Sequence, residues 1–445
     1  MDNNIKLVVT SSSFYQLFFR LKGDNLQNIF LQSPLKSLKI NNIYLAQVSQ
    51  IMDSLGAAFV NLGNNQQAFL KFNKSRDKLR VGEKILVQVV KEETIPNKLA
   101  VVSRDITLRG SLIIFKPFLT NIIFSKKLTE NDRNQIITTL GYSKENSKYG
   151  LIIRSLYKHN LLQELALEFQ HLKDLWGEIK NQNKVGLLWE ANVIENVLLS
   201  NSQSIPQEII TSTISEAKQV KNILNHHKFL DIKESIYTKK EDILNYYNIS
   251  ESLQDITSNK LLVKDSLNLV FYEQEAFNYI DVNFAGELSF NTKEEVAYKT
   301  NMEIFPIIVQ QILLRNLSGQ IFIDILKITN KQYRNNLLAL AKKLFTLDEN
   351  KTTVLGFSNM GLLEISRQKT QDSFSLISKS LDYKLHCLIM NLKKLIVFSP
   401  EKVIVVISSK QLARLKEVAS KDLEELNISI QFKIDETSKI PKIEE

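Results

Sequence analysis

Residues 276–283 read AFNYIDVN, and residues 320–326, which follow after a helical stretch, read QIFIDIL. Both stretches are rich in aromatic and β-branched residues, the composition of a β-strand. Strand and helix patterns alternate around them, with strands expected at 261–263, 267–272 and 353–357 and helices before Arg315 and at 331–347. The region from 260 to 368 is therefore predicted to be an α/β unit built on these two strands.

An aspartate stands in each of the two strands, Asp281 in the first and Asp324 in the second. A carboxylate beside a buried apolar strand is costly unless a positive charge offsets it. If both strands lie in one sheet, the two carboxylates can converge on Mg²⁺, which needs only one or two protein carboxylates. Such an ion activates water and neutralises a phosphodiester, and Asn283 shares a strand face with Asp281 and can orient it. The alternative is that each aspartate only begins a turn after its strand.

Residues 42–108 are predicted to be a small all-β module. Strands expected at 43–51, 57–60, 68–72, 84–91 and 99–103, with polar turns between them, suit a closed barrel of the oligonucleotide-binding kind. In such a barrel Phe59 and Phe69 can stack bases, while Lys91 and Lys98 can meet phosphates. Phenylalanine in a strand more often belongs to a hydrophobic core, so both interpretations stay open.

The other segments give simpler predictions. Residues 6–10, 14–21 and 26–32 are expected strands with a hairpin at 22–25, residues 165–179 an amphipathic helix, 200–206 a polar linker, and 207–260 mostly helix. Thr292 and Glu295 predict a capping box that opens a helix, which Pro306 is expected to split or kink. The tail after 380 is predicted as helix, strand (403–407), helix and strand (428–434).

Length and composition limit the class of protein. A chain of 445 residues suggests two to four compact units, and its net charge of +9 and pI of about 9.2 favour an anionic partner, although solubility alone would explain the charge equally well. The single cysteine, Cys387, excludes a disulfide framework and a zinc site built from cysteines of one chain. No apolar run reaches ~18 residues, so neither a transmembrane helix nor a membrane partner is expected. We expect no signal or transit peptide at the start, and the abundance of Asn, Lys and Ile fits a plastid or an A/T-rich bacterium.

Two arginines follow apolar runs. Arg154 with Ser155 combines a guanidinium fork with a hydroxyl, which suits a phosphate. Arg367 follows a strand-like run near the two aspartates. From the residues alone, a solvated turn is the better explanation of Arg154 and Ser155.

Taken in order, these segments resemble the ribonuclease E/G family. The segments that carry the resemblance are AAFV (57–60), AFL (68–70), GEKILVQVVKEE (82–93), GLIIRS (150–155), IDVN (280–283), GQIFID (319–324) and GLLEISRQ (361–368). The likeness extends over about residues 1 to 370. It implies an endoribonuclease that uses Mg²⁺ to cut single-stranded, A/U-rich RNA, prefers 5′-monophosphate ends, and acts in processing and decay of mRNA and rRNA precursors.

The resemblance also assigns roles to residues. Asp281 and Asp324 would hold Mg²⁺ and act in catalysis with Asn283. RNA contacts would come from Phe59, Phe69, Lys91, Lys98 and Arg367, and the RNA 5′ phosphate would be sensed by Arg154 and Ser155.

The implied fold is an α/β multidomain protein. Its parts would be an RNase H-like domain split between 1–35 and 205–260, an oligonucleotide-binding barrel (36–118), a 5′-sensor region (119–204), a DNase I-like catalytic domain (261–375) and a small C-terminal α/β region (376–445). We expect a plastid (chloroplast stroma) protein, or alternatively one of the bacterial cytoplasm.

Three features depart from the family pattern. Cys387 has no partner cysteine for the family's zinc link between subunits, so any homo-oligomer would form without zinc. Membership of an RNA-processing complex is left as a possibility. Lys327 stands where the family often has a second acid, and residues 284–287 lack the usual basic side chains. A non-catalytic RNA-binding protein with the same fold is therefore the main alternative. A membrane-surface or DNA-binding protein is a third, which rests on charge alone.

Overall fold

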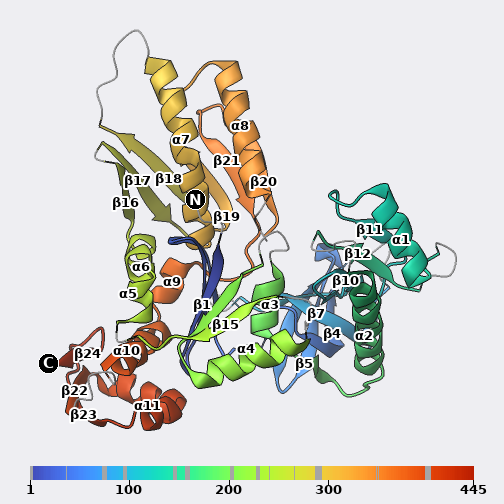
Figure 1. Ribbon diagram of the computed structural model, residues 1–445, viewed down its shortest axis with the longest axis horizontal. Helices are drawn as coiled ribbons and strands as arrows, with labels where there is room; N and C mark the ends of the chain where they lie inside the picture. Colours follow the sequence, from blue (N-terminus) through green and yellow to red (C-terminus); the bar gives the residue numbers. More distant parts are fainter. Residues whose placement is uncertain are drawn as a thin grey trace. The chain divides into compact units, whose positions relative to one another are not determined.

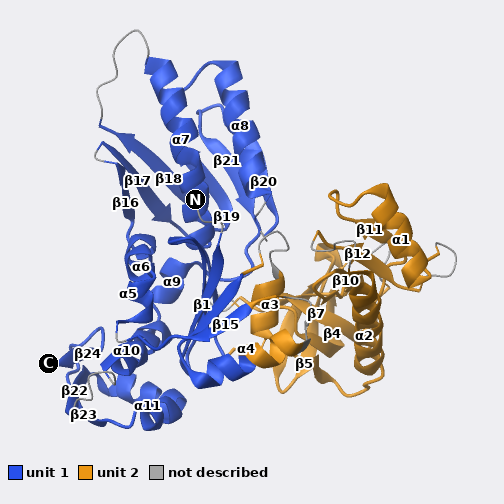
Figure 2. Cartoon of the chain, in the orientation of Figure 1, with its two compact units in different colours: residues 1–35, 207–219, 233–445 blue, residues 36–206, 220–232 orange. Residues whose placement is uncertain are grey.

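The chain forms two compact units in a computed structural model (Figures 1 and 2). One unit comprises residues 1–35, 207–219 and 233–445, and the other comprises residues 36–206 and 220–232. The structure describes residues 4–36, 38–72, 78–93, 98–143, 148–155, 161–226, 231–239, 241–264, 266–285, 293–346, 348, 350–395 and 402–444, except that 201–204 are omitted and only the backbone is described at 200 and 226.

The first sheet of unit 1 is assembled from segments far apart in the sequence. Its strands, in spatial order, are β15 (Lys233–Ile236), β14 (Glu208–Thr211), β1 (Ile5–Ser11), β2 (Gln16–Lys22) and β3 (Asn25–Gln32). The first three strands of the chain are antiparallel and joined by short turns, whereas β1, β14 and β15 run parallel. Parallel neighbours need long connections, and α4 (Ile214–His226) lies in the connection between β14 and β15.

The C-terminal part of the chain shares a hydrophobic core with this sheet. Val8, Phe19 and Ile210 of the sheet lie in one cluster with apolar side chains of the tail, which include Leu385 and Leu415. The elements of this region are α5 (Ile243–Tyr246), α6 (Ile249–Thr257), α9 (Phe374–Ser378), α10 (Leu381–Leu395), β22 (Lys402–Ile407), α11 (Ser409–Glu425), β23 (Ser429–Ile434) and β24 (Lys442–Glu444). The tail is thus part of the core of unit 1.

The second sheet of unit 1 contains the two aspartate strands. Its strands, in spatial order, are β16 (Lys260–Lys264), β17 (Leu267–Glu273), β18 (Phe277–Phe284), β19 (Gly319–Asp324), β21 (Leu363–Arg367) and β20 (Thr352–Phe357). The long helices α7 (Lys293–Leu314) and α8 (Lys331–Phe345) pack against one face through a core that includes Ile280, Ile308 and Ile323. Residues on the other face alternate with these buried ones and are partly or fully exposed.

Unit 2 contains a closed five-stranded barrel. Its strands are β4 (Ile43–Met52), β5 (Ala57–Gly63), β6 (Gln66–Lys71), β8 (Val101–Ser103) and β7 (Lys84–Lys91), and the pairing of β4 with β7 closes it. Between β4 and β5 the chain turns through η1 (Asp53–Leu55) and Gly56, whose φ of 58° suits a residue without Cβ. β13 (Gly186–Trp189) pairs with the first three residues of β4.

The rest of unit 2 is an α/β layer with a core of its own. It consists of β9 (Leu108–Arg109), β10 (Ile113–Lys116), β11 (Ile122–Phe124), α1 (Glu130–Leu140), β12 (Gly150–Ile153), α2 (Leu162–Lys180) and α3 (Val193–Ser200). Leu165, Leu172 and Trp176 of α2 lie in this core, at the helical spacing seen in the sequence.

Most differences from the sequence predictions are local. Helices occur between 207 and 260, but the region also supplies strands β14 and β15. Helix α7 continues through Pro306 as one helix and is not split there. The capping residue Thr292 and most of the 200–206 linker lie outside the described residues. No helix within the described ranges is long and apolar enough to cross a lipid bilayer.

Candidate active site

The structure brings Asp281 and Asp324 together on adjacent strands. β18 and β19 pair in parallel, and within this ladder Asp281 is the direct partner of Asp324. Helix α7 provides the crossover that a parallel pair requires. Both side chains lie on the face opposite α7 and α8 and are half-buried. The predicted convergence of the two carboxylates thus has a structural basis in strand order and register.

Each carboxylate is held by a neutral donor on strand β18. The Asn283 Nδ2 donates to Asp281 Oδ2 at 2.9 Å, as expected for a residue that orients this aspartate. The Tyr279 hydroxyl donates to Asp324 Oδ2 at 2.8 Å across the two strands. Tyr279 was not predicted from the sequence as a site residue, although its position two residues before Asp281 places it on the same strand face.

The phenol of Tyr279 is a stable donor. Burial is the main cause that raises its pKa to about 12, and the hydrogen bond to Asp324 and the negative charges of Asp324 and Asp281 raise it further. The hydroxyl therefore keeps its proton at neutral pH. Tyr279 thus restrains one oxygen of Asp324 as Asn283 restrains one oxygen of Asp281.

The chemistry of this donor set fits a hard divalent cation. Adjacent strands are ~4.8 Å apart, so two carboxylates in register repel each other unless a cation lies between them. With one oxygen of each carboxylate engaged, one oxygen of Asp281 and one of Asp324 suit a cation that takes its other ligands from water and phosphate. Among the described residues no group of three or more His, Cys, Asp or Glu could hold a metal.

The barrel presents an aromatic pair on its outer surface. Phe59 of β5 and Phe69 of β6 are direct cross-strand partners, with ring centroids 5.9 Å apart and planes at 71°. Both side chains are half-buried, whereas their neighbours Val60 and Ala68 point into the barrel core. Lys91 ends β7, and Lys98 is exposed just before β8. Phe59 and Phe69 are therefore on the outer face of the barrel and not in its core.

Arg154 is buried at the end of β12. Its guanidinium donates to the carbonyl oxygen of Gly110 at 2.9 Å and to the carbonyl oxygen of Leu199. The Glu168 carboxylate accepts from the backbone N–H groups that follow Gly110, including that of Leu112 at 2.8 Å. Arg154 and Glu168 thus fix the turn between β9 and β10. Ser155, which follows Arg154 in the sequence, is half-buried.

Arg367 is enclosed in unit 1 and not displayed to a ligand. Its guanidinium forms a two-pronged ion pair with Asp348 at 2.8 and 3.0 Å and also donates to Asn316 Oδ1 at 2.8 Å and to the Leu317 carbonyl oxygen at 2.9 Å. The side chains of Arg367 and Asp348 are only 5% and 2% exposed. Because this geometry suits a structural role, we do not retain Arg367 among the proposed RNA contacts.

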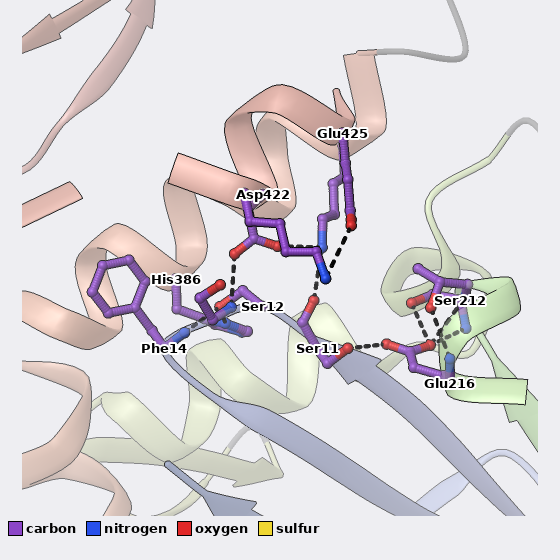
Figure 3. A network of polar contacts seen from close by, with 12 residues as sticks. Ser11, Ser12, Phe14, Ser212, Glu216, His386, Asp422 and Glu425 are labelled. Atoms are coloured by element: carbon purple, nitrogen blue, oxygen red, sulfur yellow. Dashed lines mark hydrogen bonds and ion pairs between the residues drawn. The ribbon is translucent and has the colours of Figure 1, made fainter. Parts of the chain in front are cut away.

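A second cluster in unit 1 contains the residue types of a nucleophilic triad but not its geometry (Figure 3). Ser12 Oγ lies 2.8 Å from His386 Nδ1, but Asp422 accepts from the Ser13 backbone N–H at 2.7 Å and from Lys393 Nζ at 3.2 Å. Burial, followed by the positive charge of Lys393, lowers the pKa of His386 to about 3. Ser12 and His386 are both buried, so the cluster anchors α10 and α11 to the end of β1 and does not face a substrate.

Two departures from the family pattern can also be located. Cys387 of α10 is half-buried, and burial is the main cause that raises the pKa of its thiol. Lys327 is exposed three residues after Asp324.

Comparisons with known proteins found a matching family model and several similar proteins. The model of the family described as "Ribonuclease E/G family" matches residues 107–370, a range that includes both aspartates and Arg154. The chain is 26% identical over 381 residues to a protein named "Ribonuclease G" from Escherichia coli (strain K12), covering 79% of this chain and 77% of that protein. It is 27% identical over 373 residues to "Ribonuclease E/G-like protein" from Porphyra purpurea, covering 78% and 72%, and 26% identical to the protein of that name from Pyropia yezoensis.

Proposed function

Because the chain belongs to the ribonuclease E/G family, we propose that it is an endoribonuclease that uses Mg²⁺ at Asp281 and Asp324 to cut single-stranded RNA. The observation that carries the metal site is the direct pairing of the two aspartates on β18 and β19, each restrained by a neutral donor. Family membership supports a ribonuclease. The metal, the RNA preference and the site residues are our proposals.

A bound Mg²⁺ would supply charge neutralisation at the phosphodiester and a more acidic water. The chain's own residues have positioning roles. Asp281 and Asp324 each offer one carboxylate oxygen to the cation, while Asn283 and Tyr279 hold the second oxygen of each and so limit rotation of the carboxylates. We propose that cleavage leaves 5′ phosphate and 3′ hydroxyl ends.

The barrel would bind RNA upstream or downstream of the cut. Phe59 and Phe69 form an outward aromatic pair on which unpaired bases can stack, and stacking tolerates any base sequence. Lys91 and Lys98 lie on strands or strand ends of the same barrel and would meet phosphates. We propose A/U-rich RNA as the preferred substrate because such strands are the least paired.

We also propose that Arg154 and Ser155 sense a 5′ monophosphate. Arg154 would have to exchange carbonyl partners for the phosphate, since it now holds Gly110 and Leu199. Cleavage of one RNA with a 5′ monophosphate or a 5′ hydroxyl tests this directly. A wild-type preference that Arg154→Lys abolishes would support sensing, and equal rates on both RNAs by the wild type would exclude it.

The catalytic proposal is tested by RNA cleavage with Mg²⁺ by the wild type, Asp281→Asn and Asp324→Asn. Each variant should lose more activity than the ~10- to 100-fold typical of a residue that only orients a metal ligand. Asp24→Asn, which changes an exposed turn between β2 and β3, is the matched control. Equal cleavage by all four proteins would contradict the metal site.

The alternative function is a non-catalytic RNA-binding protein. It is favoured by Lys327, which stands near Asp324 in place of a second acid. It predicts RNA binding that survives chelation and no cleavage at any Mg²⁺ concentration. Cleavage that requires Mg²⁺ and Asp281 would exclude it.

The cellular role and architecture remain proposals of the same kind. The sheet built from β1–β3 with β14 and β15 supports an RNase H-like domain split by an insertion, and the six-stranded sheet with α7 and α8 supports the proposed catalytic domain. We propose processing and decay of mRNA and rRNA precursors in a plastid, with algal and bacterial relatives both represented among the similar proteins. Any homo-oligomer would form without a zinc link, since the chain has one cysteine.

A further inference from the structure

The open face of the β16–β21 sheet carries a cluster of aromatic side chains beside the aspartates. We call this cluster the aromatic platform, and it consists of Tyr272, Phe277, Tyr279 and Phe322. It comes from β17, β18 and β19, and its members lie on the face opposite α7 and α8. None of them was singled out by the sequence patterns that pointed to the aspartates.

The strand register places the platform in rows next to the acid pair. Asp281 and Asp324 form one row, and two residues earlier Tyr279 pairs with Phe322. Tyr272 pairs with Tyr279 on the other side and extends this second row onto β17. Because strands rise ~3.3 Å per residue, the second row lies ~7 Å from the aspartates, and Phe277 lies one row farther.

The rings contact one another but remain open to a ligand. Tyr272 and Tyr279 have ring centroids 6.1 Å apart, and Phe277 and Phe322 have centroids 5.9 Å apart. Tyr272 is 50% exposed and Phe277 is 40% exposed. A contiguous group of exposed aromatic rings on one sheet face is typical of a binding surface.

The charges on this face narrow the kind of contact it can make. The outward positions of β17, β18 and β19 that the structure describes contain no lysine or arginine. Lys260 of the adjacent strand β16 is exposed and pairs with Val270 of β17, so a phosphate can meet a positive charge beside these three strands but not on them. Ring stacking on bases is the interaction that this face does offer, and aromatic side chains on an open sheet are a known platform for unpaired bases.

We propose that the aromatic platform is a base-stacking subsite for the unpaired RNA nucleotides on one side of the phosphate that is cut. This inference rests on the proposed ribonuclease function and extends it. The platform adjoins the acid pair through shared strands, so a phosphodiester at Asp281 and Asp324 places its neighbouring bases over Tyr279, Phe322 and then Phe277. A base-paired strand cannot expose its bases to these rings, so the platform selects single strands.

The test pairs a change in the protein with a change in the RNA. The double variant Tyr272→Leu/Phe277→Leu removes the two most exposed rings and keeps apolar side chains. The RNA is a short single strand of A and U, and a set of copies carries one abasic nucleotide at successive positions around the cleavage site. The equilibrium Kd is measured by fluorescence anisotropy with a chelator present, and KM and kcat are measured with Mg²⁺.

The proposal predicts a specific pattern. Wild-type protein should bind about tenfold more weakly when the abasic nucleotide falls on one side of the cut. The double variant should bind the unmodified RNA about tenfold more weakly and show no further loss on the abasic RNAs, with KM raised more than kcat is lowered. Tyr272→Phe/Phe277→Tyr, which keeps both rings, should restore the wild-type pattern.

Controls separate the platform from a general loss of apolar surface or of fold. Leu262→Ala removes an exposed aliphatic side chain from β16 of the same sheet and should leave binding unchanged. Thermal unfolding of each variant checks that the fold is kept. If the double variant binds RNA with wild-type affinity and responds to abasic RNA as the wild type does, the base-stacking proposal is overturned. The proposed ribonuclease function would not be affected by that result.

Two other outcomes also overturn the proposal. Light scattering could show a wild-type dimer that is lost in the double variant, while the wild type binds abasic and unmodified RNA equally well. The platform would then hold a second copy of the chain and not RNA. If the wild type neither binds nor cuts the RNA, the proposed function itself fails.

Discussion

The hydroxyl of Tyr279 gives the most specific prediction about the site. Tyr279→Phe keeps the ring, which belongs to the aromatic platform, and removes only the oxygen that donates to Asp324 at 2.8 Å. Without this bond the Asp324 carboxylate can rotate, and part of the energy of cation binding must then be used to fix it. The change is therefore expected to weaken cation binding more than RNA binding.

The size of the effect follows from the type of bond. A hydrogen bond to a charged group contributes about 1.5–3 kcal/mol, and the half-buried position of Tyr279 argues for the lower value. About 1.5 kcal/mol corresponds to about a tenfold change in an equilibrium constant. The Mg²⁺ concentration that gives half-maximal cleavage should therefore rise about tenfold, within the range found for residues that orient metal ligands.

The assay is a Mg²⁺ titration of the cleavage rate, repeated with calorimetric titration of Mn²⁺ in the absence of RNA. Saturating Mg²⁺ should restore most of the wild-type kcat. Tyr272→Phe removes a hydroxyl from the neighbouring ring, for which no bond to either carboxylate is described, and is the matched control. A Tyr279→Phe protein with the wild-type half-saturating concentration and the wild-type Mn²⁺ affinity would refute the positioning role.

Three further predictions concern other parts of the chain. The pKa of His386 is lowered to about 3 in the folded state, so between pH ~6.5 and pH ~3 only the unfolded chain takes up a proton at this residue. The free energy of unfolding should therefore fall by about 2 kcal/mol between pH ~7 and pH ~5. In urea unfolding, the free energy of unfolding of His386→Gln should depend less steeply on pH. An equally steep dependence in that variant would contradict this. Arg367→Met leaves the Asp348 carboxylate buried without its ion-pair partner and should lower the free energy of unfolding by about 3–5 kcal/mol. The loss should be smaller in the double variant Arg367→Met/Asp348→Asn. An unchanged urea midpoint of Arg367→Met would exclude the structural role. Phe59→Leu/Phe69→Leu should weaken RNA binding by the barrel about tenfold in anisotropy titrations, and wild-type affinity would show that the pair does not stack bases.

The sequence predicted strands well where apolar and β-branched residues form a long run. The strand predicted at 84–91 is β7 (Lys84–Lys91), and the hairpin after β2 forms around Gly23, whose φ is 57°. β7 is rich in β-branched and other apolar residues, a composition that favours a strand, and its residues Ile85, Val87 and Val89 lie in the barrel core. Strands β14 and β15 have four residues each, too few to show a period, and helical patterns flank them.

The candidate site was only partly visible in the sequence. Asp281 and Asp324 stood out as carboxylates in apolar strands, but their direct pairing depends on strand order and register, which no local pattern encodes. Tyr279 was missed because a tyrosine in a strand normally indicates packing. The buried ion pair of Arg367 could not be predicted because its partner, Asp348, lies nineteen positions away in the sequence.

The central claim is that Asp281 and Asp324 hold a divalent cation. The most direct measurement is the anomalous scattering of Mn²⁺ in crystals of the full chain soaked with the ion, since Mn²⁺ takes the same oxygen ligands as Mg²⁺. A peak within coordination distance of one oxygen of Asp281 and one oxygen of Asp324, absent from Asp281→Asn crystals, is the predicted result. Density that shows the two carboxylates without an ion between them at saturating Mn²⁺, in a protein that still cuts RNA, would contradict the claim.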